Sequence, residues 1–167
     1  MIAPHFLRRR NKSRGSAIVE MGLVMITFLA LVLATVDFGM AIFVKATLQH
    51  AVREGVRYAI TYQMAAGLKH DDSIKAVVMQ QSMGILQGTT GASQIYIRYF
   101  DPANPGTELS GVGSNAPQSI VQVSVEGYQW KWFAPIWRSA TPLSIYVMSA
   151  DRMETLPGGL TAPPART

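Results

Sequence analysis

Apolar residues fill one long stretch near the start of the chain and then narrow to a helical stripe. Between Ser16 and Val36 the sequence reads SAIVEMGLVMITFLALVLATV, which is long and apolar enough to cross a bilayer as a helix. Asp37 marks the end of this part, and small or apolar residues then recur at steps of three and four as far as Ala59. No proline interrupts residues 16–63, and a helix of that length would be about 70 Å long. Its second half must therefore pack on the rest of the chain.

A second helix is predicted where apolar residues again recur at helical spacing. Its N-cap would be Asp72 or Ser73, and it should end in the Gly-Thr-Thr-Gly of residues 88–91. The apolar positions are Ile74, Val77, Val78, Ile85 and Leu86.

The period then changes to two, which is typical of strands. Three segments alternate in this way and are rich in β-branched or aromatic residues: 94–100 (QIYIRYF), 120–126 (IVQVSVE) and 143–149 (LSIYVMS). By composition, residues 101–118 are a loop and residues 156–167 a flexible tail. Two helices followed by three strands predict an α+β domain. Its antiparallel sheet should pack on the second half of the first helix, beyond Asp37.

Charge is unevenly divided along the chain. Five basic residues and no acidic one precede the apolar stretch, so the positive-inside rule places the N-terminus in the cytoplasm and everything after the span outside. These residues are Arg8, Arg9, Arg10, Lys12 and Arg14. The other ten Lys and Arg are matched by ten Asp and Glu, so the exported part is neutral and gives no support to a nucleic-acid partner. We therefore divide the chain into a basic leader (1–15), a transmembrane helix (16–37), an exported domain (38–155) and the tail.

The residue types of catalytic and metal sites are sparse. There is no cysteine, which excludes disulfides and thiolate ligands or nucleophiles. His5, His50 and His70 are far apart and are expected to be lone, exposed side chains, and Asp71-Asp72 is more typical of a helix cap than of a cation site. We expect no enzyme, no cofactor and no metal.

One carboxylate, Glu20, interrupts the apolar stretch. A charge there costs about 3 kcal/mol at the bilayer centre and less near the headgroups, so a function is worth seeking. Just before it, Gly15 and Ser16 form a small, flexible pair that an extended segment could present to a protease. Cleavage between them would create an ammonium on Ser16, which Glu20 of the same or a neighbouring helix could pair with. The alternative is that Glu20 snorkels to the headgroups from an anchor that is never cut.

Two segments carry a family resemblance. Residues 14–21, RGSAIVEM, with the apolar run behind them, resemble the processing region of type IV pilin-like proteins. Residues 37–58, DFGMAIFVKATLQHAVREGVRY, resemble the TadE-like proteins of the tight-adherence (Flp) pilus system. The resemblance implies a pilin-like fold and a minor pilin or pseudopilin of the bacterial inner membrane, with its domain in the periplasm or in a surface pilus. Met21 stands where such pilins usually have an aromatic residue, which argues against a main fibre subunit.

The resemblance also implies a processing site and partners. A prepilin peptidase would cut between Gly15 and Ser16, so that Glu20 becomes the fifth residue of the mature protein. Expected partners are that peptidase, other major and minor pilins, the pilus assembly platform and membrane lipid. The alternatives are an unprocessed single-pass membrane protein with an exported binding domain and, less in keeping with the pattern, a secreted enzyme.

Two further groups of residues have two interpretations each. All three tryptophans lie in residues 128–137 (YQWKWFAPIW), where Trp130 and Trp132 could form a docking surface or fill the small core. Arg53, Glu54 and Arg57 on the first helix could be a solvated face or a set of subunit contacts.

Overall fold

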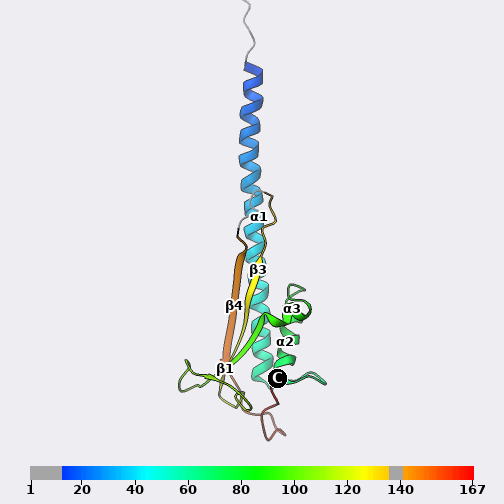
Figure 1. Cartoon of the computed structure of the whole chain (residues 1–167), viewed down its shortest axis with the longest axis vertical. Helices are drawn as coiled ribbons and strands as arrows, with labels where there is room; N and C mark the ends of the chain where they lie inside the picture. Colours follow the sequence, from blue (N-terminus) through cyan, green and yellow to red (C-terminus); the bar gives the residue numbers. More distant parts are fainter. Residues whose placement is uncertain (1–12, 136–140) are drawn as a thin grey trace, which may run out of the picture.

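The first helix is a single rod that continues from the apolar stretch into the domain. The computed structural model describes residues 13–135 and 141–167, so most of the basic leader lies outside the described residues. Helix α1 (Ser13–Ile60) has 48 residues, and Figure 1 shows its first half projecting bare from the folded domain. The predicted continuous helix is therefore confirmed, with its end at Ile60.

The sheet is antiparallel and has four strands. These are β1 (Ile95–Phe100), β2 (Glu108–Leu109), β3 (Ile120–Trp130) and β4 (Leu143–Arg152), in the spatial order β2-β1-β3-β4. The α+β class is confirmed, with one strand more than predicted. The extra strand β2 lies in the expected loop 101–118, where Leu109 pairs with Tyr99.

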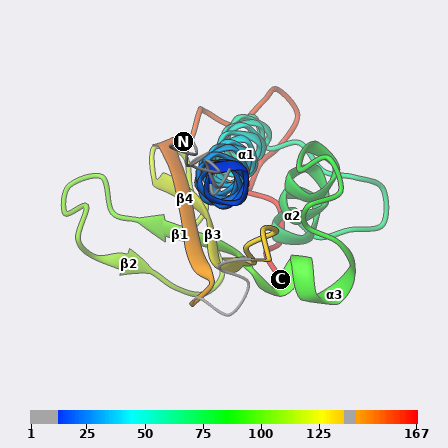
Figure 2. The ribbon, with the colours of Figure 1, turned by 90° about the horizontal axis from the view of Figure 1, so that it is seen from above.

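The core forms where α1 is enclosed by the rest of the domain. Figure 2 shows α1 between the sheet on one side and α2 on the other. The fully buried side chains of Leu48 and Val52 on α1 belong to one cluster with Val123 of β3 and Ile74 and Val78 of α2. Two layers of structure thus bury the apolar stripe that the sequence predicts for the second half of α1.

The second helix differs from its prediction at both ends. Helix α2 (His70–Gln81) begins with Lys69 as N-cap, before Asp72 or Ser73, and stops before Ile85 and Leu86. It ends there because Ser82 donates its hydroxyl to the Met79 carbonyl oxygen and accepts from the Leu86 amide, while Gly84 turns the chain at φ +83°. The Gly-Thr-Thr-Gly segment is not a helix stop but the start of the short helix α3 (Gly88–Ser93).

Glycine allows α1 and α2 to approach each other closely. A Cβ atom at Gly55 would lie 2.4 Å from Cγ2 of Val78, a fully buried and β-branched side chain that has little room to turn. We expect Gly55→Ala to lower the free energy of unfolding by about 1–3 kcal/mol. Gly39→Ala is the control, because a Cβ on the same helix there meets nothing within 4 Å and should raise stability by up to about 1 kcal/mol. Denaturant titrations in detergent would measure both, and equal effects would contradict the close approach.

Candidate functional site

The proposed processing residues lie on the first turns of α1, away from the domain. Gly15, Ser16 and Glu20 are all exposed, and the Ser16 hydroxyl donates a hydrogen bond to Glu20 Oε1 at 3.0 Å. The two side chains are four residues apart and so share one face of the helix. The structure therefore brings the residue that would become the mature N-terminus next to the carboxylate.

The fold itself has no need for glycine at position 15. A Cβ atom built there meets nothing within 4 Å, and the residue is in a helix, where glycine costs about 1 kcal/mol relative to alanine. A requirement from outside the folded chain, such as the active site of a protease, would explain a residue that the fold does not demand.

Residues 15–36 of α1 present an apolar surface that the domain leaves uncovered. Its large side chains are more than half exposed almost throughout, from Ile18 at 73% to Val36 at 52%. The hydroxyl groups of Thr27 and Thr35 donate hydrogen bonds to backbone carbonyl oxygens one turn earlier in the helix. These polar groups are therefore satisfied within the helix. This helix is long and apolar enough to cross a membrane, and its surface suggests membrane anchoring.

Asp37 connects the end of the bare segment to the domain. Its side chain is 1% exposed, and its two carboxylate oxygens accept hydrogen bonds of 2.8 Å from the backbone amides of Phe133 and Ala134. Beside it, Phe38 and Trp132 make an edge-to-face contact with ring centroids 5.4 Å apart. The loop after β3 is thus fastened to α1 where the apolar segment leaves the domain.

Trp130 and Trp132 of the tryptophan-rich segment have different surroundings, and a docking role for either stays a prediction. Trp130 is half-buried and packs against the core cluster, whereas Trp132 is half-buried on Phe38 and donates its indole N–H to the Thr141 carbonyl oxygen. Phe133 is 72% exposed. Trp137, at the end of the segment, lies outside the described residues.

The charged group on α1 lies on the part of the helix that packs in the domain. Arg53 and Arg57 are exposed and Glu54 is half-buried, but no salt bridge joins these three described residues. They form a charged face on the packed half of α1, and a role in subunit contacts stays a prediction.

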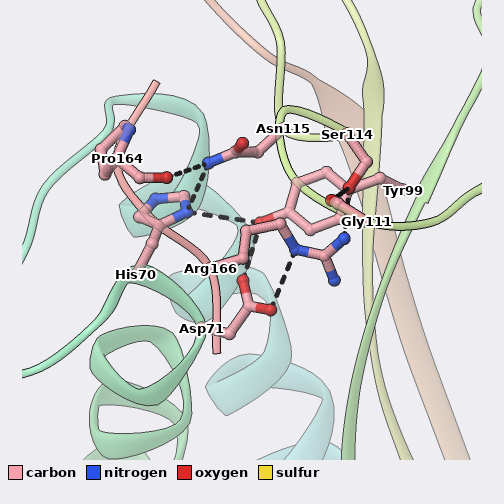
Figure 3. A network of polar contacts seen from close by, with 8 residues as sticks. All are labelled: His70, Asp71, Tyr99, Gly111, Ser114, Asn115, Pro164 and Arg166. Atoms are coloured by element: carbon pink, nitrogen blue, oxygen red, sulfur yellow. Dashed lines mark hydrogen bonds and ion pairs between the residues drawn. The ribbon is translucent and has the colours of Figure 1, made fainter. Parts of the chain in front are cut away.

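A buried polar network that the sequence did not reveal joins α2, β1 and the end of the chain (Figure 3). The Tyr99 hydroxyl lies 3.2 Å from Asp71 Oδ1 and 3.3 Å from His70 Nδ1. Arg166 forms a 3.0 Å ion pair with Asp71 and lies over the Tyr99 ring, 4.3 Å from its centroid. Asn115 donates to the Pro164 carbonyl oxygen at 2.9 Å. The network fastens the last residues of the chain to the domain.

Three predictions are corrected by this network. His70 is not a lone exposed side chain but fully buried, and Asp71 lies in the first turn of α2, not at its cap. Residues 156–167 were expected to be a flexible tail, yet Pro164 is buried and the Ala165 carbonyl oxygen accepts from the His70 amide at 3.0 Å. The prediction failed because it used only the local composition. Pro164, Ala165 and Arg166 contact residues that are more than forty positions away in the sequence.

Burial lowers the pKa of the His70 imidazole, and this outweighs the opposite effect of the Asp71 carboxylate beside it. The folded state then binds fewer protons than the unfolded state as the pH falls below the ordinary histidine pKa of about 6.5. Stability should therefore be full above that pH and decline as the pH falls toward the lowered pKa, by at most about 1.4 kcal/mol per pH unit. Denaturation midpoints in detergent between about pH 7 and 5 would measure this. His70→Gln should flatten the decline and exposed His50→Gln should not, so an unchanged slope in the first variant would contradict the assignment.

The side chains of the network contact one another and are largely closed to a ligand from solvent. His70 Nε2 and Asn115 Oδ1 are buried with no hydrogen-bond partner among the described residues, and the side chains around them are largely closed to solvent. Within residues 13–135 and 141–167, no three His, Asp or Glu side chains are grouped so as to hold a metal ion.

A comparison with known protein families finds a match on the first helix. Residues 15–57 match the family of TadE-like proteins. No curated protein and no solved structure matches the chain. The matched segment begins at Gly15, includes Glu20 and Asp37, and covers the bare half of α1 and most of the packed half. Over most of its long N-terminal helix, this chain is therefore similar to TadE-like proteins.

Proposed function

We propose that this protein is a minor pilin or pseudopilin that takes part in assembling or priming a tight-adherence (Flp-type) pilus. The observation that carries the proposal is the TadE-like helix itself, whose bare apolar half has Gly15, Ser16 and Glu20 at its free end. A soluble protein would bury such a surface, so this half of α1 needs a bilayer or other helices around it.

The proposed sequence of events begins in the inner membrane. Helix α1 crosses it with the basic leader on the cytoplasmic side and the domain in the periplasm. A prepilin peptidase cuts between Gly15 and Ser16 and leaves an ammonium on Ser16. Glu20 then pairs with the ammonium of a neighbouring pilin, which compensates two charges in surroundings with little water. The proposed partners are this peptidase, other pilins and the assembly platform.

An unprocessed membrane-anchored protein is the second candidate. It is favoured by the 3.0 Å hydrogen bond from Ser16 to Glu20, which partly satisfies the carboxylate in the uncut chain without any neighbour. In that case Glu20 would serve the anchor alone, and the exported domain would act as a binding module.

Intact-mass measurement on the membrane fraction of the native host distinguishes the possibilities. Loss of residues 1–15 alone supports the pilin proposal, and the full chain supports the unprocessed anchor. Loss of the whole apolar segment would indicate a secreted protein and would contradict both. The pilus yield of a deletion strain, with and without the gene restored, then tests the role in assembly, since an unchanged yield would exclude it.

A further inference from the structure

We propose that Lys131, Trp132 and Phe133 form a membrane-contacting collar, which lies in the headgroup region on the outer face of the bilayer that α1 crosses. The collar would give the exported domain a second contact with lipid, in addition to its helix. This inference rests on the proposed anchoring by α1.

The collar is held at one fixed level of the helix. The Asp37 carboxylate accepts from the amides of Phe133 and Ala134, and the Trp132 ring packs on Phe38. Figure 1 shows the end of β3 and the start of β4 on the side of the domain from which the bare half of α1 projects. The depth of the helix in the membrane therefore determines the depth of the collar.

Helix length places that level at the outer boundary of the hydrocarbon. Residues 16–36 span about 30 Å at 1.5 Å per residue, which is about the thickness of a bilayer's hydrocarbon core. With the cytoplasmic boundary near Ser16, the opposite boundary falls at Asp37 and the loop attached to it. The domain would then begin where the hydrocarbon ends.

The side chains of the collar suit such an interface. Phe133 is 72% exposed, and Lys131 is exposed and can extend its ammonium group to the lipid headgroups. Trp132 has a half-buried ring and an indole N–H that is satisfied by the Thr141 carbonyl oxygen, and tryptophan is enriched at the interfaces of membrane proteins. The backbone amides of Phe133 and Ala134 are paired with Asp37, so these two polar groups are satisfied at the interface.

The surface around the collar is continuous with the membrane-spanning surface. Phe38 is 56% exposed, Ile42 68% and Leu143 41%, and these side chains extend the apolar surface of α1 to the edge of the domain. This continuity favours lipid over a separate protein partner, because the collar then shares the environment already required by the helix.

The chain has no cysteine, so a single introduced cysteine can be labelled specifically. Single-cysteine variants Phe133→Cys, Val112→Cys and Leu29→Cys each take one environment-sensitive fluorophore on the full-length protein in liposomes of phosphatidylethanolamine and phosphatidylglycerol. Val112, fully exposed and far from the collar in sequence, is the aqueous control, and Leu29 reports the middle of the span. We expect the probe at 133 to be quenched by a spin label near the lipid headgroup and to be several-fold less accessible to iodide than the probe at 112.

The outcomes separate the collar from the anchor. The probe at position 29 could lie deep in the bilayer while the probe at position 133 is as accessible to iodide as the probe at position 112. This result would contradict the lipid contact of the collar and would leave the anchoring by α1 intact. If the probe at 29 is aqueous, the anchoring itself fails. Shielding of 133 from both quenchers would indicate a contact with a second copy and would also overturn the lipid proposal. Because all three tryptophans lie within residues 130–137, quenching of native fluorescence by brominated lipid, expected to be strong, checks the result without any substitution.

Discussion

Replacing Gly15 with valine should leave the protein uncut in the membrane fraction, with residues 1–15 still attached. The structure has open space at this position, so the added side chain should not disturb the fold. Valine does, however, add a bulky β-branched side chain and cannot readily adopt the positive-φ conformations that glycine offers to a protease active site. We expect the mature form to be absent or nearly so, as measured by intact mass.

Gly22→Val is the matched control for this experiment. It lies on the same exposed helix, and a Cβ atom there also meets nothing within 4 Å. Its mature mass should differ from that of the unmodified protein only by the substitution itself. Normal removal of residues 1–15 in Gly15→Val would show that the cut lies elsewhere or does not occur.

Most of the helical part of this fold could be predicted because its signals are local. The apolar run, the stripe beyond Asp37 and the absence of proline all describe one helix, and α1 has that form. The alternating segments likewise predicted β1, β3 and β4. Strand β2 was missed because two residues, Glu108 and Leu109, are too short to show a period.

The candidate site divides in the same way. Gly15, Ser16 and Glu20 are neighbours in sequence, so their proximity on one helix follows from helical geometry. The tether from Asp37 to Phe133 joins residues 96 positions apart and uses backbone amides, which have no sequence signature. The sequence could mark Asp37 as the end of the apolar segment but could not identify what it binds.

The buried network was missed for a related reason. His70, Asp71, Tyr99 and Arg166 come together only when α2, β1 and the end of the chain meet. One signal was present in the sequence. Arg166 has the only charged side chain in segment 156–167, and such a residue can form an ion pair with a carboxylate elsewhere in the domain. Composition alone nevertheless favoured a flexible tail.

Glu20→Leu should abolish incorporation into pili while cleavage and the amount of protein in the membrane stay near normal. Removing a charge from the apolar segment cannot make insertion harder on transfer energetics, because an acidic residue costs about 3 kcal/mol near its centre. Glu20 is exposed on the bare helix and contacts only the Ser16 side chain among the described hydrogen bonds, so the fold should tolerate the change. The loss would then lie in contacts between subunits.

Two matched variants locate the cause of that loss. Ser16→Ala removes the hydroxyl that donates to Glu20 but keeps the new ammonium, so it should assemble if the ammonium is the partner that matters. Glu20→Gln keeps the size and removes the charge, so it should fail as Glu20→Leu does. The measurement is a paired one, mature protein in the membrane against the yield of sheared pili or of crosslinked complex. A normal yield with Glu20→Leu would refute charge pairing and leave Glu20 as a residue of the anchor alone.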